Sequence, residues 1–216
     1  MSRQQIVLLL TPPLLLATTY GVYRLLVPRL GRRGGYLAGF LFYWLGWCLI
    51  LPLALLGPQG IRDLFRVDLP GLGQPWWLAL SFLVIPLLLG FGYAFPRALR
   101  AKPGWRSVVI SVAIALVNGI LEEVLWRGAY VSLFPDQWLL AVLYPAVGFG
   151  VWHFSPQSVF PNRAPGGNLS LVLVAAILGL LWGWVAYASG SIGWTVASHV
   201  LFDFSGLGGR VYVAKR

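Results

Sequence analysis

Residues 119–130 read G-I-L-E-E-V-L-W-R-G-A-Y, and this stretch decides how the rest of the chain must be arranged. Glu122, Glu123 and Arg127 stand there inside an apolar run with the length and composition of a membrane-spanning helix. An ionisable group at the centre of a bilayer costs about 2.5 to 3.5 kcal/mol on insertion scales. Three such groups close together are tolerated only if they pair with one another or face a polar cavity. This stretch is therefore the first candidate for a functional site.

The composition of the 216-residue chain is that of an integral membrane protein. Hydrophobic residues make up 58% of it and charged residues only 10%, whereas about 25% of a soluble domain is charged. The formal net charge is +10, but the basic residues gather in short loops between apolar runs, so we expect no nucleic-acid partner. The lipid bilayer is the expected environment. The only cysteine, Cys48, lies in an apolar run and is expected to be a buried hydrophobe.

A membrane-spanning helix needs about 20 mostly apolar residues, and on this rule the chain divides into about seven spans. The expected fold class is therefore all-α, a polytopic integral membrane helix bundle without a soluble domain. The first span begins like a signal peptide, but no small-x-small cleavage site follows, so we expect it to remain as a helix. The predicted spans are residues 5–23, 36–57, 75–95, 107–134, 138–154, 171–188 and 192–209.

We expect one membrane domain over residues 1–216, with accessory helices at 1–106 and a core at 107–209 that holds the intramembrane ionisable groups. Proline and glycine cluster at 58–74, which predicts a loop there. The span 107–134 would be about 42 Å long as a continuous helix. We therefore expect it to tilt, to protrude or to break near Asn118 and Gly119.

Lysine and arginine residues gather in the loops on one side of the predicted bundle, which is typical of cytoplasmic loops. This bias places the N-terminus outside the cell and the C-terminus inside. The residues concerned are Arg24, Arg29, Arg32 and Arg33 after the first span, Arg97, Arg100, Lys102 and Arg106 after the third, and Arg210, Lys215 and Arg216 in the tail.

Both histidines of the chain, His153 and His199, also lie inside predicted spans, and Asp203 follows His199 by four residues. At 1.5 Å per residue, Glu122 lies about 21 Å and His153 about 25 Å from the turn at Asp136. His199 and Asp203 lie about 14 Å and 20 Å along the last span from a turn on the same side. Four polar groups from three helices are therefore predicted to meet at similar depth, displaced towards the cytoplasmic side.

The spacing of the first charged motif indicates separate roles for its two acids. Glu123 and Arg127 are four residues apart with the acid first, which favours an intrahelical ion pair, and Glu122 points about 100° away. Beside a neutral imidazole from His153, Glu122 is placed to hold a water and to take its proton as general base. A purely structural role is the alternative reading, most of all for the ion pair.

The last motif can serve in either of two ways. His199 and Asp203 share one helix face, where they can orient each other or donate hydrogen bonds to a developing oxyanion. Phe149 is expected to shape the pocket wall.

The three motifs, in this order, resemble those of the CPBP family of intramembrane proteases, which includes the CAAX prenyl endopeptidases and the bacterial Abi proteins. They are Glu-Glu-x-x-x-Arg at 122–127, Phe-x-x-x-His at 149–153 and His-x-x-x-Asp at 199–203, and the resemblance covers roughly residues 107–209.

The resemblance implies an all-helical membrane endopeptidase in which Glu122 and His153 activate water while His199 and the residue at 203 form the oxyanion site. The last position is often Asn in the family. Because Asp203 donates a hydrogen bond only when protonated, orienting His199 is an equally plausible role for it.

The resemblance also implies a membrane-associated peptide or protein substrate, either a prenylated CAAX tail or another membrane peptide. We expect a multi-pass protein of a bacterial plasma membrane, and the loop charges and helix depths predict that its site opens towards the cytoplasm. Two other functions stay open: a non-enzymatic bacteriocin-immunity or adaptor protein, and a proton-coupled transporter. The transporter is less favoured, because the sequence has no two-fold repeat and no paired broken helices.

We expect no cofactor and no catalytic metal, with zinc as the alternative, although the family is often described as metalloproteases. The chain has no His-Glu-x-x-His motif, and catalytic zinc usually takes three protein ligands with the base supplied separately. A metal held by Glu122, His153 and His199 would occupy the best base and both imidazoles. Asp203 alone would then remain to activate water.

Overall fold

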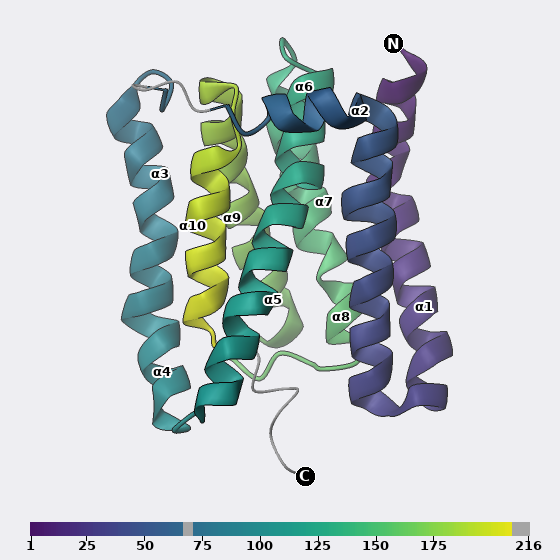
Figure 1. Ribbon diagram of the computed structural model, residues 1–216, viewed down its shortest axis with the longest axis vertical. Helices are drawn as coiled ribbons and strands as arrows, with labels where there is room; N and C mark the ends of the chain where they lie inside the picture. Colours follow the sequence, from purple (N-terminus) through teal and green to yellow (C-terminus); the bar gives the residue numbers. More distant parts are fainter. Residues whose placement is uncertain (67–70, 209–216) are drawn as a thin grey trace.

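The computed structural model describes residues 1–66 and 71–208, which form a bundle of helices without a strand (Figure 1). The chain is an all-α integral membrane protein, as its composition predicted. Within the described residues, five helical stretches are long and apolar enough to cross a membrane, so the predicted count of seven is not confirmed. They are Arg3–Asp63, Trp76–Arg100, Trp105–Leu133, Leu139–Gln157 and Gly167–Ser189.

Two predicted spans lie in the first of these stretches. It comprises α1 (Arg3–Phe42), the π-helical segment η1 (Tyr43–Ile50) and α2 (Leu51–Asp63). Gly31 has a φ of 72°, which glycine adopts without a Cβ clash, and the chain reverses there so that its two halves run side by side (Figure 1). A second kink at Gly57 directs α2 across the end of the bundle. The loop predicted from residue 58 is therefore wrong as far as Asp63, because the kink redirects the helix without ending it.

The charged motif lies on the third of the stretches. Before it come α3 (Trp76–Leu89), η2 (Gly90–Ala94) and α4 (Phe95–Arg100). Then α5 (Trp105–Glu123) continues through η3 (Val124–Ala129) into α6 (Tyr130–Leu133). Of the three alternatives expected for this span, a break near Asn118 and Gly119 is wrong, since α5 is helical through both. The departure from α-helical geometry comes directly after Glu123, and π-helical segments of this kind are frequent at functional sites.

The remaining helices carry both histidines. They are η4 (Leu139–Leu143), α7 (Tyr144–Trp152), α8 (Phe154–Gln157), α9 (Gly167–Ser189) and α10 (Gly193–Ser205). With 13 residues, α10 is shorter than a spanning helix needs to be. The predicted end of the last span at residue 209 and the basic tail residues Arg210, Lys215 and Arg216 lie outside the described residues.

Glycines bring the motif-bearing helices together. A Cβ at Gly119 of α5 would lie 2.7 Å from Val200 Cγ2 of α10, so only glycine allows the two backbones to approach this closely. A Cβ at Gly150 of α7 would lie 2.7 Å from the carbonyl oxygen of Val172 on α9. The same two pairs, α5 with α10 and α7 with α9, form the most extensive helix contacts of the bundle. The close packing sets the positions of all three motifs.

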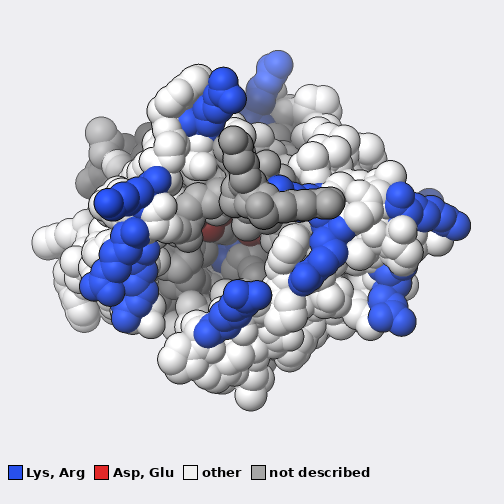
Figure 2. All heavy atoms as spheres, turned by 90° about the horizontal axis from the view of Figure 1, so that it is seen from below, with Lys and Arg blue, Asp and Glu red and all other residues white. Residues whose placement is uncertain are grey.

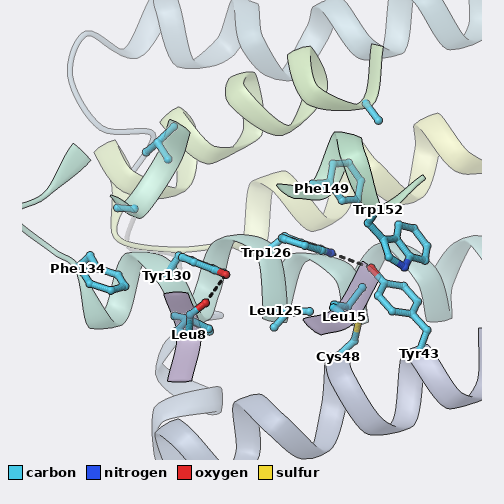
Figure 3. Close-up of a cluster of buried hydrophobic side chains, with 14 of the residues drawn as sticks. Leu8, Leu15, Tyr43, Cys48, Leu125, Trp126, Tyr130, Phe134, Phe149 and Trp152 are labelled. Carbon is cyan, nitrogen blue, oxygen red and sulfur yellow. Dashed lines mark hydrogen bonds between the residues drawn. The ribbon is translucent and has the colours of Figure 1, made fainter. Parts of the chain in front are cut away.

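A hydrophobic core joins the first helices to the rest of the bundle (Figure 3). Its buried side chains come from α1, η1, η3, α6, η4, α7 and α9. Members labelled in Figure 3 are Leu8, Leu15, Tyr43, Cys48, Leu125, Trp126, Tyr130, Phe134, Phe149 and Trp152. The accessory helices of residues 1–106 therefore pack directly against the helices that carry the motifs, and Cys48 is a buried hydrophobe, as predicted.

Candidate active site

One cavity of about 290 Å³ brings together Glu122, His153, His199 and Asp203. Side chains from α1, α9 and α10, among them Phe40, Leu171 and Phe202, make much of its remaining wall apolar. Viewed from below, the molecule has a hollow with acidic side-chain atoms at its base and lysines and arginines around it (Figure 2). The predicted convergence of these four residues is confirmed, and their catalytic roles stay a prediction.

Glu122, at the end of α5, is held by hydrogen bonds on both of its oxygens. Its side chain is 2% exposed. The Tyr43 hydroxyl donates to Oε1 at 3.0 Å, and Asn118 Nδ2 donates to Oε2 at 3.1 Å. His199 Nε2 lies 3.5 Å from Oε2. The carboxylate is thus fixed by neutral donors while each oxygen keeps a lone pair for a further partner.

Tyr43 was not predicted as a site residue. Its hydroxyl also accepts a hydrogen bond from Trp126 Nε1 at 2.8 Å, which leaves the phenolic hydrogen for Glu122 (Figure 3). Its ring stacks on the ring of Trp152, with 3.9 Å between the two ring centroids. Trp152 directly precedes His153 in the chain. A tyrosine in an apolar helix attracts no attention in a sequence, and 79 residues separate it from Glu122. Only the reversal of the chain at Gly31 brings the two together.

Asn118 links the two carboxylates of the cavity. Trp44 Nε1 donates to Asn118 Oδ1 at 2.8 Å, which fixes the amide so that its Nδ2 faces the acids. Nδ2 then donates to Oε2 of Glu122 and, at 2.8 Å, to Oδ2 of Asp203. The spacing of Asn118 four residues before Glu122 was the one sequence signal that could have indicated this contact.

Glu123 forms the predicted ion pair and a second contact that the sequence did not indicate. Its Oε1 lies 3.0 Å from Arg127 Nη1, so the predicted pair is confirmed. The same oxygen lies 2.8 Å from His199 Nδ1. Because a carboxylate only accepts, Nδ1 carries a hydrogen there. Glu123 therefore orients the imidazole of the last motif.

Arg127 belongs to the same buried group, and its guanidinium lies over two aromatic rings. Its guanidinium carbon lies 4.5 Å from the centre of the Phe149 ring and 5.3 Å from that of Trp182. Among the described residues, neither terminal nitrogen has a well-aligned hydrogen-bond acceptor, so the contact with Glu123 is an ion pair rather than a hydrogen bond. Phe149 therefore lines the cavity on one side and shields this cation on the other.

Both histidines have Nδ1 engaged and Nε2 available, but the partner of Nδ1 differs between them. His153 Nδ1 lies 2.7 Å from the carbonyl oxygen of Phe149, and because a carbonyl only accepts, Nδ1 is the donor and Nε2 is the acceptor of the neutral ring. His199 stacks on Trp182, with centroids 4.3 Å apart, and its Nδ1 is engaged by Glu123. Its Nε2 is the nitrogen nearest to the other two carboxylates.

Asp203 is not the orienting partner of His199 in this structure. Its Oδ2 lies 3.6 Å from His199 Nε2, beyond hydrogen-bond range, and instead accepts from Asn118. Glu123 orients His199 instead, a role that the sequence had indicated as possible for Asp203. The aspartate is the more accessible of the pair, with 23% of its side chain exposed against 3% for His199.

The residues considered as metal ligands have other hydrogen-bond partners in this arrangement, and the absence of a catalytic metal stays a prediction. Among residues 1–66 and 71–208, no three His, Cys, Asp or Glu side chains are grouped so that they could hold a metal ion. Both oxygens of Glu122 already accept hydrogen bonds, and His199 Nδ1 is bound to Glu123. Tyr43 and Asn118 hold the Glu122 carboxylate as donors, while the Phe149 carbonyl and Glu123 hold the two imidazoles as acceptors.

Comparison with known proteins agrees with the resemblance of the three motifs. Residues 103–205 match the family model described as "Type II CAAX prenyl endopeptidase Rce1-like". None of the curated proteins and none of the solved structures compared with the chain matches it. The matched range holds every candidate residue of the cavity that the sequence indicated, whereas Tyr43 lies outside it. Residues 103–205, just under half of the chain, thus form a domain similar to the Rce1-like type II CAAX prenyl endopeptidases, a family of membrane proteases.

Proposed function

We propose that this protein is an intramembrane endopeptidase that hydrolyses a peptide bond with water activated by Glu122 and His153. The observation that supports the proposal most strongly is the single cavity lined by Glu122, His153, His199 and Asp203. A general base and an oxyanion donor must both reach one reacting carbonyl group, and these residues are the groups suited to those two tasks.

Glu122 is the general base of the proposed reaction. Tyr43 and Asn118 hold its oxygens without neutralising them, so one free lone pair can accept a proton from water. The Nε2 lone pair of His153 is a second acceptor and orients the same water. The water oxygen attacks the carbonyl carbon of the substrate as its proton passes to Glu122. General base catalysis of this kind contributes about 10² to 10⁴ in rate.

His199 stabilises the oxyanion that forms. Its Nδ1 donates to Glu123, so Nε2 becomes a donor when the ring is an imidazolium. Three carboxylates lie within 3.6 Å of this imidazole, and they favour a positive ring. When the tetrahedral intermediate collapses, the proton held by Glu122 passes to the leaving nitrogen and the carbon–nitrogen bond breaks. The products are an amine and a carboxylic acid, which then loses its remaining proton to become a carboxylate.

The substrate we propose is a membrane-associated peptide with an apolar or prenylated residue near the cleaved bond. Phe40, Phe160, Leu178 and Phe202 give the cavity an apolar wall beside its polar floor. The basic residues around the hollow in Figure 2 support a cytoplasmic opening, because lysine and arginine mark cytoplasmic loops. A bacterial plasma membrane is the location we propose.

Cleavage of membrane peptides by the purified protein tests this function. Pairs of peptides that differ only in a prenyl group on one cysteine would be incubated with wild type and with Glu122→Gln in liposomes. Cleavage that depends on Glu122 is expected. Ion flux into the same liposomes without cleavage would instead indicate the transporter, and a pocket that binds peptide without any turnover would indicate an immunity or adaptor protein.

A further inference from the structure

A second hollow lies between the lower end of α1 and the segment that follows α8. Its volume is about 540 Å³, and none of the residues that line it lines the candidate active site. From α1 it is lined by Arg24, Val27 and Arg32, which surround the kink at Gly31, and from the segment after α8 by Val159 and Pro161.

The two arginines give this hollow a positive charge that the described part of the chain does not balance. No Asp or Glu lines it. Within residues 1–66 and 71–208, neither Arg24 nor Arg32 forms an ion pair. Arg32 Nη2 donates to the carbonyl oxygen of Val159, and its guanidinium lies 4.9 Å from the centre of the Phe160 ring. Since arginine carries five N–H donors, most of those on Arg32 remain for a ligand.

The position of the hollow favours a ligand that is part of the membrane. The kink at Gly31 lies at the end of the bundle where lysines and arginines gather (Figures 1 and 2). Val27, Val159 and Pro161 add an apolar wall beside the two charges. A phosphate with an apolar continuation matches this combination, because arginine binds phosphate through paired N–H groups and basic pockets between transmembrane helices hold lipid head groups.

We propose that the hollow beside Arg24 and Arg32 binds the phosphate headgroup of an anionic phospholipid. The headgroup lies between the two guanidinium groups, and the start of the acyl chains lies along the apolar wall. Free phosphate shares the charge but not the apolar part, so the lipid is the expected ligand. This proposal does not depend on the proposed proteolysis.

The single side chain of Phe160 connects Arg32 of this hollow to the candidate active-site cavity. Arg32 lies over Phe160, and the Phe160 ring meets the Tyr36 ring edge-on at 4.9 Å. Phe160 and Tyr36 both line the candidate active-site cavity. A headgroup bound to Arg32 therefore also fixes Phe160 and Tyr36, which form the wall on this side of the cavity.

Lipid binding can be measured on the intact protein by native mass spectrometry and by thermal unfolding. The protein would be placed in nanodiscs of phosphatidylcholine with or without phosphatidylglycerol, and separately in detergent with inorganic phosphate. We expect one phosphatidylglycerol to remain bound and to raise the unfolding temperature. Arg24→Gln, which removes a side chain with no hydrogen bond or ion pair in the described part of the chain, should weaken this lipid about fivefold. The double variant with Arg32→Gln should weaken it further.

Arg100→Gln is the matched control, because Arg100 is an exposed arginine of the same basic face outside the hollow. It should leave the lipid bound. Equal loss in Arg24→Gln and Arg100→Gln would show general surface attraction and overturn the proposal. Stabilisation by inorganic phosphate as large as that by phosphatidylglycerol would overturn the assignment to a lipid.

Discussion

His199 Nδ1 lies 2.8 Å from Glu123 Oε1, so the second glutamate of the Glu-Glu pair supports the imidazole of the last motif. The same oxygen faces Arg127 at 3.0 Å. One carboxylate oxygen thus joins the ion pair of α5 and η3 to the histidine of α10. Glu122, its neighbour in sequence, faces the cavity instead. The adjacent acids approach His199 from different sides, Glu123 at Nδ1 and Glu122 at Nε2, because consecutive helical residues point about 100° apart.

Glu123→Gln is expected to lower both the folded yield and the activity of the protein that does fold. Removing one partner of a buried ion pair destabilises by about 3 to 5 kcal/mol. The loss of the charge behind His199 should also lower kcat by about 10², the loss expected when an oxyanion donor fails. Arg127→Ala is the control, since it breaks the same pair but leaves Glu123 bound to His199. Full activity of folded Glu123→Gln would remove Glu123 from the mechanism. The measurement is the cleavage rate per folded molecule.

Tyr43→Phe is expected to lower kcat about tenfold to a hundredfold with little change in KM. It removes the hydrogen bond to the charged Glu122, worth about 1.5 to 3 kcal/mol, together with the acceptor of Trp126 Nε1, while the ring and its stacking on Trp152 stay. Tyr130→Phe is the matched control, because its hydroxyl is equally buried but donates to the carbonyl of Leu8. An equal loss of kcat in both variants would mean that Tyr43 acts through stability alone. Steady-state kinetics and thermal unfolding of both variants decide between these outcomes.

Activity is expected to survive prolonged treatment with a chelator, and the active enzyme is expected to contain no stoichiometric zinc. Glu122 already accepts hydrogen bonds on both oxygens, and no three candidate ligands are grouped for a metal in the described part of the chain. Elemental analysis of active protein and assay after chelation are the measurements. Activity that is lost to the chelator and restored by added metal would show that a metal takes part.

Single cysteines at residues 24–33 and 97–106 are expected to resist an impermeant reagent on intact cells, because the basic residues of these segments predict a cytoplasmic location. The background is Cys48→Ser, which removes the buried native thiol. A cysteine at Asp136, between α6 and η4 at the other end of the bundle, is the accessible control. Labelling at residues 24–33 but not at 136 would place the cavity opening outside the cell.

Much of this arrangement could be predicted from charge and spacing. Charges are rare in apolar helices, so Glu122, His153, His199 and Asp203 stood out, and helical rise placed them at similar depth. The ion pair between Glu123 and Arg127 is local, and its spacing alone predicted it. All of these inferences use distances along one helix or the cost of charge in a membrane.

The contacts that were missed depend on packing between distant segments. Tyr43 reaches Glu122 only because the chain reverses at Gly31, where the sequence indicated a loop but not how the two halves would pack. The contact between Glu123 and His199 depends on the close approach of α5 and α10 at Gly119. The π-helical geometry of η3 was not predicted either, since it leaves no simple pattern of apolar residues. Neutral donors such as Tyr43 and Asn118 carry no charge that would mark them in a sequence.

The role of Glu122 as general base of peptide hydrolysis can be tested by comparing cleavage by wild type and by Glu122→Gln in the same liposomes. Gln keeps the shape of the side chain and an acceptor for Tyr43 but cannot take a proton from water. Thermal unfolding should establish that both proteins are folded. Cleavage by Glu122→Gln should fall by about 10² to 10⁴ because the general base is lost. Cleavage by folded Glu122→Gln at the rate of wild type would contradict this role.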